Sequence, residues 1–277
     1  MKTAVSLLPC DSWSSHYQLC LRSFLYLAKA AYPCGYIDES LEVLNLIIEK
    51  GGELNDKIDV YYLLVSIEAT NNPPKAFKTC IEVLGYLGEN VPEVEIDSNV
   101  SMSLFLEVKD RFIAIPEGGE FPMEEHDNQG KESLIMYFYT HLVTLAFRIK
   151  PACIVQYIST CTAYAFNNSL RCKHTPNAIV HFASLLCSSF GPDTELGLKI
   201  GKIGMSILKK HYSSSIEAPA TILGYYGQVG ALNERIQECE FMHGRGREIA
   251  MQTGNLYMAS LNLLAMISRA MQGGKNL

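Results

Sequence analysis

A glutamate and a histidine three positions apart are the residues best suited to metal chemistry. Glu240 and His243 form an ExxH pair. On a helix this spacing puts a carboxylate and an imidazole on one face, as in the di-iron sites of helical bundles. Such a site needs a second pair and further carboxylates, and the sequence has no other ExxH. A small helical metal-binding protein or enzyme that uses Glu240 and His243 is therefore an alternative hypothesis, not the leading one.

Two groups of cysteine and histidine residues suggest zinc ligation. Cys239 lies four positions before His243, and Cys172, His174 and His181 follow one another closely. Zinc sites need three or four such ligands in a fixed geometry, and each group lacks a matching partner. Hydrogen-bonded or solvent-facing histidines are the simpler interpretation. The sequence therefore predicts no metal and no cofactor.

Motifs for phosphate binding and nucleophilic catalysis are also missing. A nucleotide-binding loop needs closely spaced glycines followed by Lys and Ser or Thr. Gly197, Gly201 and Gly204 instead lie inside an apolar-periodic segment, where small residues let neighbouring helices approach. No GxSxG elbow and no HRD or DFG kinase signature occurs. We therefore predict no catalytic residue and expect the chain not to be an enzyme.

Four residues are candidates for contact with another protein. Arg245 and Arg247 flank a glycine and could hold a phosphate or an acidic peptide, although two solvated arginines are the simpler interpretation. Tyr225 and Tyr226 are adjacent, so at least one ring must leave the face that its neighbour occupies. Exposed tyrosines in a groove anchor peptides in many helical scaffolds. These four residues are the predicted interaction positions.

Composition argues against nucleic acid or a membrane surface as the main partner. The chain of 277 residues is 48% hydrophobic with a formal net charge of −6, and no run of Lys or Arg exceeds a pair such as Lys209-Lys210. Binding to nucleic acid or anionic lipid rests on clustered positive charge. A protein partner is the remaining expectation.

Cysteine usage and hydropathy indicate the compartment. The nine cysteines are odd in number, widely spread and without a CxxC pair, as expected for reduced thiols. The amino terminus has too short an apolar run for a secretory signal. The longest apolar segment, 134–147, falls short of the roughly 20 residues that cross a bilayer. A cytoplasmic protein is predicted.

An internal repeat predicts the architecture that must position these residues. Two segments match at an offset of 40 residues, with Ile37, Leu41, Glu42, Val43, Leu44 and Ile47 falling on Phe77, Ile81, Glu82, Val83, Leu84 and Leu87. Repeats of this length are typical of stacked helical hairpins, because one hairpin cannot bury its own apolar face.

Helix start and stop signals extend this pattern along the chain. We expect helices near 11–28, 38–50, 56–69, 73–87, 99–111, 134–148, 151–167, 176–190, 194–211, 218–230, 233–253 and 256–272. No segment shows the strict alternation of a half-buried strand. The predicted fold is all-α, an α-α superhelix of antiparallel helical hairpins of tetratricopeptide-like type. Its segments are helical hairpins over 1–110, an acidic Gly/Pro-containing loop over 111–132, and further hairpins over 133–277.

An ordered set of positions resembles a known family. Its amino-terminal part comprises Trp13, Tyr17, Ala30-Ala31-Tyr32, Gly35, the expected helix from Leu41 to Ile47, Asp56-Lys57, Tyr61, Asn71-Asn72, Ala76, Val83-Leu84, Leu87-Gly88 and Pro92. Its later part comprises Ile115-Pro116, Met123, Pro176, Ala178, Ala183, Gly197, Gly201-Lys202, Gly246, Ala250, Thr253-Gly254-Asn255-Leu256 and Ala259. The set resembles the tetratricopeptide-like helical region of large signalling ATPases that carry an AAA-type ATPase domain with serine/threonine and histidine kinase domains. The glycine-rich stretch between Pro116 and Met123 departs from the family pattern as an insertion.

The resemblance implies a role in signal transduction without catalysis. It implies that the chain is a fragment, since the ATPase and kinase motifs are missing from it. The leading hypothesis is a stack of helix pairs that binds neighbouring domains or a separate signalling partner in its concave face. An unstable fragment with no independent activity is a further alternative.

Overall fold

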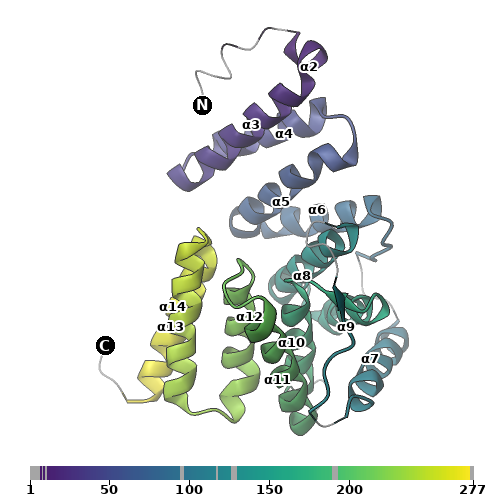
Figure 1. Ribbon diagram of the computed structural model, residues 1–277, viewed down its shortest axis with the longest axis vertical. Coiled ribbons are helices and arrows are strands. Elements are labelled where there is room, and N and C mark those ends of the chain that lie inside the picture. The colour runs from purple at the N-terminus through teal and green to yellow at the C-terminus, as the bar shows by residue number, and fades with distance from the viewer. Residues whose placement is uncertain are drawn as a thin grey trace. The chain divides into compact units, whose positions relative to one another are not determined.

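The computed structural model describes residues 7, 9, 11–93, 97–116, 118–125, 130–188 and 193–274. It confirms the all-α prediction, with thirteen α-helices and two strands of two residues each in the described part (Figure 1). The chain divides into two compact units, Met1–Val91 and Pro92–Leu277. No helix in the described part combines the length and apolar content that crossing a membrane requires.

The first unit is built from consecutive helices that pack in pairs. Its helices are α2 (Ser12–Ser15), α3 (Tyr17–Ala31), α4 (Ile37–Lys50), α5 (Leu54–Asn71) and α6 (Pro73–Tyr86). Helix α3 packs on α4, α4 on α5, and α5 on α6. The predicted helix over 11–28 is interrupted at His16, whose φ of −137° is not helical.

The 40-residue repeat relates α4 to α6. Leu44 and its equivalent Leu84 are both fully buried, and Ile47 and Leu87 are both buried core residues. The start of α6 also follows the sequence signals, because the Asn72 side chain accepts a hydrogen bond from the Lys75 amide at 3.3 Å and Pro73 occupies the first helical position. These two pairs of repeated positions are thus core positions, whereas Ile37, Leu41 and Ile81 are only partly buried.

The second unit contains the remaining helices. They are α7 (Ser98–Ile113), α8 (Lys131–Ile149), α9 (Ile154–Asn167), α10 (Thr175–Leu186), α11 (Thr194–His211), α12 (Ala218–Gly224), α13 (Ile236–Gln252) and α14 (Leu256–Gln272). Helices α7, α8 and α10 pack on α9, α10 packs on α11 and α12, and α13 packs on α12 and α14. Helix α7 belongs to this unit, whereas the sequence assigned most of it to the amino-terminal segment 1–110.

Two local features depart from the predicted helices. The helix expected over 218–230 ends at Gly224 and continues as a π-helical turn, η3 (Tyr225–Val229), followed by the short 3₁₀ turn η4 (Gly230–Leu232). Strand β1 (Glu124–Glu125) pairs in parallel with β2 (Leu170–Arg171), and the Glu124 amide donates to the Ser169 carbonyl at 2.7 Å. Strands this short leave no alternating pattern in the sequence.

The glycines of α11 let this helix approach its neighbours closely, as the sequence predicted. A Cβ atom at Gly197 would lie 2.5 Å from Cys187 Sγ, and one at Gly204 would lie 3.1 Å from the Pro176 carbonyl oxygen of α10. A Cβ atom at Gly201 would lie 2.8 Å from Val229 Cγ1 in η3. These contacts turn one face of α11 inward, and the opposite face is left outward.

We predict that Gly201→Ala destabilises the second unit. The added methyl would also lie 2.9 Å from the Tyr225 ring, and overpacking of this kind costs about 1–3 kcal/mol. Thermal melting should therefore show a lower Tm. The matched control is Gly244→Ala in α13, where the added Cβ would lie 3.6 Å from Met266 Sδ, an ordinary contact. An equal loss of Tm in both variants would contradict the packing role.

Candidate functional site

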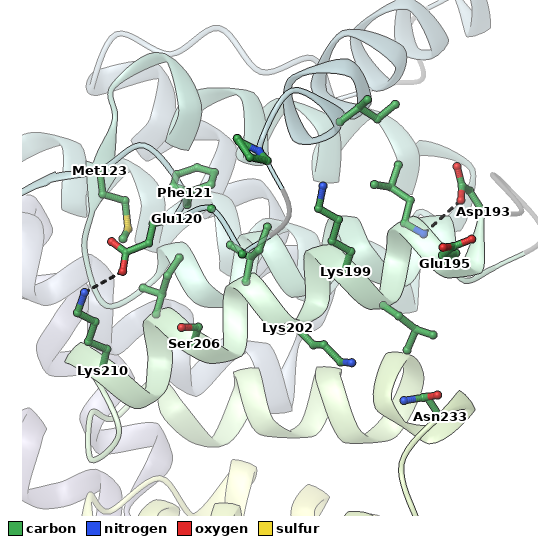
Figure 2. A pocket seen from close by; sticks show the side chains of 18 of the residues that line it. Glu120, Phe121, Met123, Asp193, Glu195, Lys199, Lys202, Ser206, Lys210 and Asn233 are labelled. Carbon is green, nitrogen blue, oxygen red and sulfur yellow. Dashed lines mark hydrogen bonds and ion pairs between the residues drawn. The ribbon is translucent and has the colours of Figure 1, made fainter.

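A groove of about 900 Å³ lies along the outward face of α11 within the second unit. One wall is α11 itself, from Glu195 to Lys210, and the other is formed by Ile113, Pro116 and residues between Gly118 and Met123 (Figure 2). The groove is open to solvent along α11, where Lys202, Ser206 and Lys210 are exposed. Its lining mixes apolar side chains with lysines and carboxylates.

The first turn of α11 is fixed by Asp193. Its side chain accepts a hydrogen bond from the Leu196 amide at 3.2 Å, which caps the helix. It also forms an ion pair with Lys109 of α7 at 2.9 Å. The hydrogen bond from Lys109 lowers the pKa of Asp193, and so this carboxylate stays charged. Asp193 thereby ties the start of α11 to α7.

Two lysines of α11 hold the opposite wall. Lys199 Nζ donates to the Ile115 carbonyl oxygen at 2.8 Å, and Lys210 Nζ lies 3.0 Å from Glu120 Oε1. The dashed line between Glu120 and Lys210 in Figure 2 marks the second contact. Hydrogen bonding from Lys210 lowers the pKa of Glu120. The segment is therefore attached to α11 near both of its ends.

A buried aromatic ring attaches this wall of the groove to the core of the second unit. Phe121 is 2% exposed, and its ring centroid lies 4.4 Å from that of Phe166 and 6.0 Å from that of Phe112. The sequence predicted an acidic surface loop over 111–132. Glu120 and Glu124 are exposed, but Phe121 packs into the core. Residues 117 and 126–129 of that loop lie outside the described part.

The predicted tyrosine anchors are buried. Tyr225 and Tyr226 are each 3% exposed, and their rings pack edge to face with centroids 4.9 Å apart. Burial raises the pKa of both phenols, to about 12 for Tyr226. The expectation that at least one ring points outward assumed that only one face of this segment is buried. The π turn η3 instead contacts α10, α11 and α13, with the Tyr225 ring between Gly201 and Gly230.

The two predicted arginines lie on the surface of α13. Arg245 and Arg247 are both exposed. Arg245 forms an ion pair with Glu248 at 2.6 Å, one turn along the same helix. Neither arginine lines the groove along α11. The structure therefore does not bring the four predicted interaction residues together in this groove.

The ExxH pair also lies on α13, and its histidine is buried. His243 is 0% exposed, and its Nδ1 lies 3.4 Å from Asn262 Oδ1 of α14. Asn262 Nδ2 in turn donates to the carbonyl oxygens of Pro219 and Met258 at 3.1 and 3.0 Å. Burial lowers the pKa of His243. This network links α12, α13 and α14, which is a structural role.

The described residues contain no group of three or more His, Cys, Asp or Glu side chains arranged to hold a metal ion. Cys172 and His174 lie at the start of α10 and are fully buried. His174 Nδ1 is 3.8 Å from Glu217 Oε2. Burial lowers the pKa of His174 well below its usual value, and burial raises that of Glu217 to about 7.

Sequence reasoning missed the groove, although one signal for it was present. Lys199, Lys202, Ser206 and Lys210 follow one another at spacings of three or four residues, which places them on one face of a helix. The opposite wall could not be found this way. It depends on contacts between residues more than 80 positions apart, such as Lys199 with Ile115.

Comparison of the chain with protein-family models, curated proteins and solved structures gives no match.

We predict that acid destabilises the second unit through its buried histidines. Burial lowers the pKa of His141 and of His181 to about 4, whereas an unfolded histidine titrates near 6.5. The folded state therefore binds fewer protons than the unfolded state between pH 4 and 6.5, and stability is lost as the pH falls through this window. Glu217 has the opposite effect, because its raised pKa favours the protonated folded state below pH 7.

The test is chemical unfolding of the wild type and of His181→Leu at pH 7 and pH 5. The wild type should be less stable at pH 5, and the variant should lose about 2 kcal/mol less between the two values because one titrating group is gone. His211→Leu, at an exposed histidine of the same unit, is the matched control. An unchanged pH difference in His181→Leu would show that burial does not lower the pKa of this imidazole relative to the unfolded state.

Proposed function

We propose that this chain is a non-catalytic helical-repeat scaffold that binds a segment of another protein in the groove along α11. The finer architecture we propose is an α-α superhelix of antiparallel hairpins. The paired packing of α3 with α4, α5 with α6, α10 with α11 and α13 with α14 supports it, as does the 40-residue repeat. In such scaffolds the stacked pairs carry one continuous surface for docking.

The groove is the observation that carries this proposal. Its wall on α11 runs from Glu195 to Lys210, a rise of roughly 22 Å at 1.5 Å per residue. An extended peptide covers this length with about seven residues. Apolar side chains such as Ile113, Ile203 and Met123 lie beside charged ones, the mixture found where a protein partner buries an apolar centre within a polar rim.

The partner in this proposal is a protein, with neither nucleic acid nor membrane as the main ligand. The acidic net charge of −6 supports that choice. The resemblance to the helical region of ATPase and kinase signalling proteins suggests a signalling partner or a neighbouring domain of the same assembly. The proposed setting is cytoplasmic, consistent with the cysteines of the described residues, all eight of which are free and most of which are buried.

Selection from a random peptide library tests the scaffold proposal. Peptides selected on the wild type should bind saturably, and Ile113→Glu should weaken them at least tenfold because it places a charge on the apolar lining. Ile113 is 53% exposed, so the change should leave the fold intact.

Ile216→Glu is the matched control, since Ile216 is 42% exposed and lies outside the lining. Circular dichroism should show the same helix content in both variants. Selected peptides that bind Ile113→Glu as tightly as the wild type would place recognition elsewhere, and a library that yields no binder would refute the scaffold role.

A further inference from the structure

We infer that the groove along α11 takes an extended acidic peptide, with carboxylates on alternate residues facing the row Lys202, Ser206 and Lys210. The inference rests on the proposed function and specifies the chemistry of the partner. It goes beyond that function because it predicts the sign of the partner's charge, the spacing of its charged residues and the conformation of the bound segment.

Ion pairs within the protein leave part of the lysine charge in the groove uncompensated. Three carboxylates line the groove, and two of them already have lysine partners: Asp193 pairs with Lys109, which lies outside the lining, and Glu120 pairs with Lys210. Lys199 donates to a neutral carbonyl and so keeps its positive charge. Lys202 is exposed and makes no hydrogen bond or ion pair with another described residue. Against these two lysines stands Glu195, at the amino-terminal end of the groove, and the adjoining hollow that shares Lys202, Ser206 and Lys210 is lined by Lys209, Glu234 and Glu238.

The chain's own contacts show how the lysines of the groove bind oxygen acceptors. The segment opposite α11 places the Glu120 carboxylate on Lys210 and the Ile115 carbonyl on Lys199. Figure 2 shows Glu120 and Lys210 facing one another from the two walls. The ion pair is exposed, with side chains 57% and 74% accessible for Lys210 and Glu120. Exposed pairs of this kind contribute little free energy, so a carboxylate from a partner can replace Glu120.

The spacing of Lys202, Ser206 and Lys210 along α11 matches that of alternate side chains in an extended peptide. Lys202, Ser206 and Lys210 are four residues apart, a rise of roughly 6 Å per step. Alternate side chains of an extended peptide are about 6.6 Å apart and lie on one face. Three acidic side chains at alternate positions can therefore reach Lys202, the Ser206 hydroxyl and Lys210 together. Acidic residues at every third position would instead place successive carboxylates on opposite faces of the extended peptide, so that only one of the two lysines is reached at a time.

Fluorescence anisotropy with three synthetic probes tests the inference. The acidic probe is a labelled ten-residue peptide of Thr with Glu at the alternate positions 4, 6 and 8. A second peptide has the same composition with Glu at every third position, 2, 5 and 8, and a third has Lys in place of Glu at positions 4, 6 and 8. The alternating acidic probe should bind tightest, and its affinity should fall when salt is raised from 50 to 300 mM.

Lys202→Glu should lower the affinity of the alternating acidic probe at least tenfold. The matched control Lys131→Glu makes the same charge change at an exposed lysine of α8 that lies outside the lining, and it should leave binding unchanged. Glu120→Gln should raise the affinity, because it frees Lys210. Loss of binding in Lys131→Glu as large as in Lys202→Glu would overturn the site.

Outcomes separate this inference from the scaffold proposal. Tighter binding of the basic probe, or equal binding of the two acidic probes, would overturn the inference while a groove that binds peptides remains. Binding of a single-stranded oligonucleotide more tightly than the acidic probe would also overturn it, in favour of a general polyanion surface. Library-selected peptides without acidic residues that depend on Ile113 would refute the inference and support the proposed function.

Discussion

The close approach of α11 to its neighbours determines which of its faces can act as a binding surface. Because Gly197, Gly201 and Gly204 have no side chains, the backbone of α11 lies directly against α10 and η3. A helix packed this closely cannot rotate about its axis without steric clash. The glycine face is inward, and so the lysine face is outward. The charges of the groove are therefore presented by a rigid element, which keeps their spacing fixed.

The opposite wall is stabilised by a different kind of interaction. A segment containing Pro116, Gly118, Gly119 and Pro122 has little regular backbone hydrogen bonding of its own. Burial of Phe121 between Phe112 and Phe166 supplies the apolar free energy that orders it, and the lysines of α11 then orient its polar groups. Helix α7, which carries Phe112, is joined to α11 through Lys109 and Asp193. Both walls of the groove are thus stabilised by contacts with α7.

Sequence reasoning succeeded where local chemistry decides the structure. The bounds of α11 and α14 were predicted to the residue, since Asp193 and Asn255 cap them and Thr253 and Gly254 separate α13 from α14. Sequence reasoning failed where contacts between residues distant in the sequence determine the structure. Tyr225 and Tyr226 are both buried because η3 packs on several neighbouring helices, with the Tyr225 ring against glycines at positions 201 and 230. The β1–β2 pairing and the burial of Phe121 are likewise invisible to periodicity.

The groove also has an energetic feature that favours specific over diffuse electrostatic binding. A lysine loses up to about 2 kcal/mol of rotamer entropy when a ligand immobilises it. Lys199 has already lost part of this freedom through its hydrogen bond to the Ile115 carbonyl, so a partner that uses Lys199 orders less of the protein on binding. Lys202 is different, because no described residue holds it. A partner must order that side chain itself, and only a ligand with a carboxylate at the matching position recovers this loss through a charge-assisted hydrogen bond. The lysines of the groove therefore contribute unequally, because Lys199 is held in place before binding whereas Lys202 is ordered only by a partner that offers it a carboxylate.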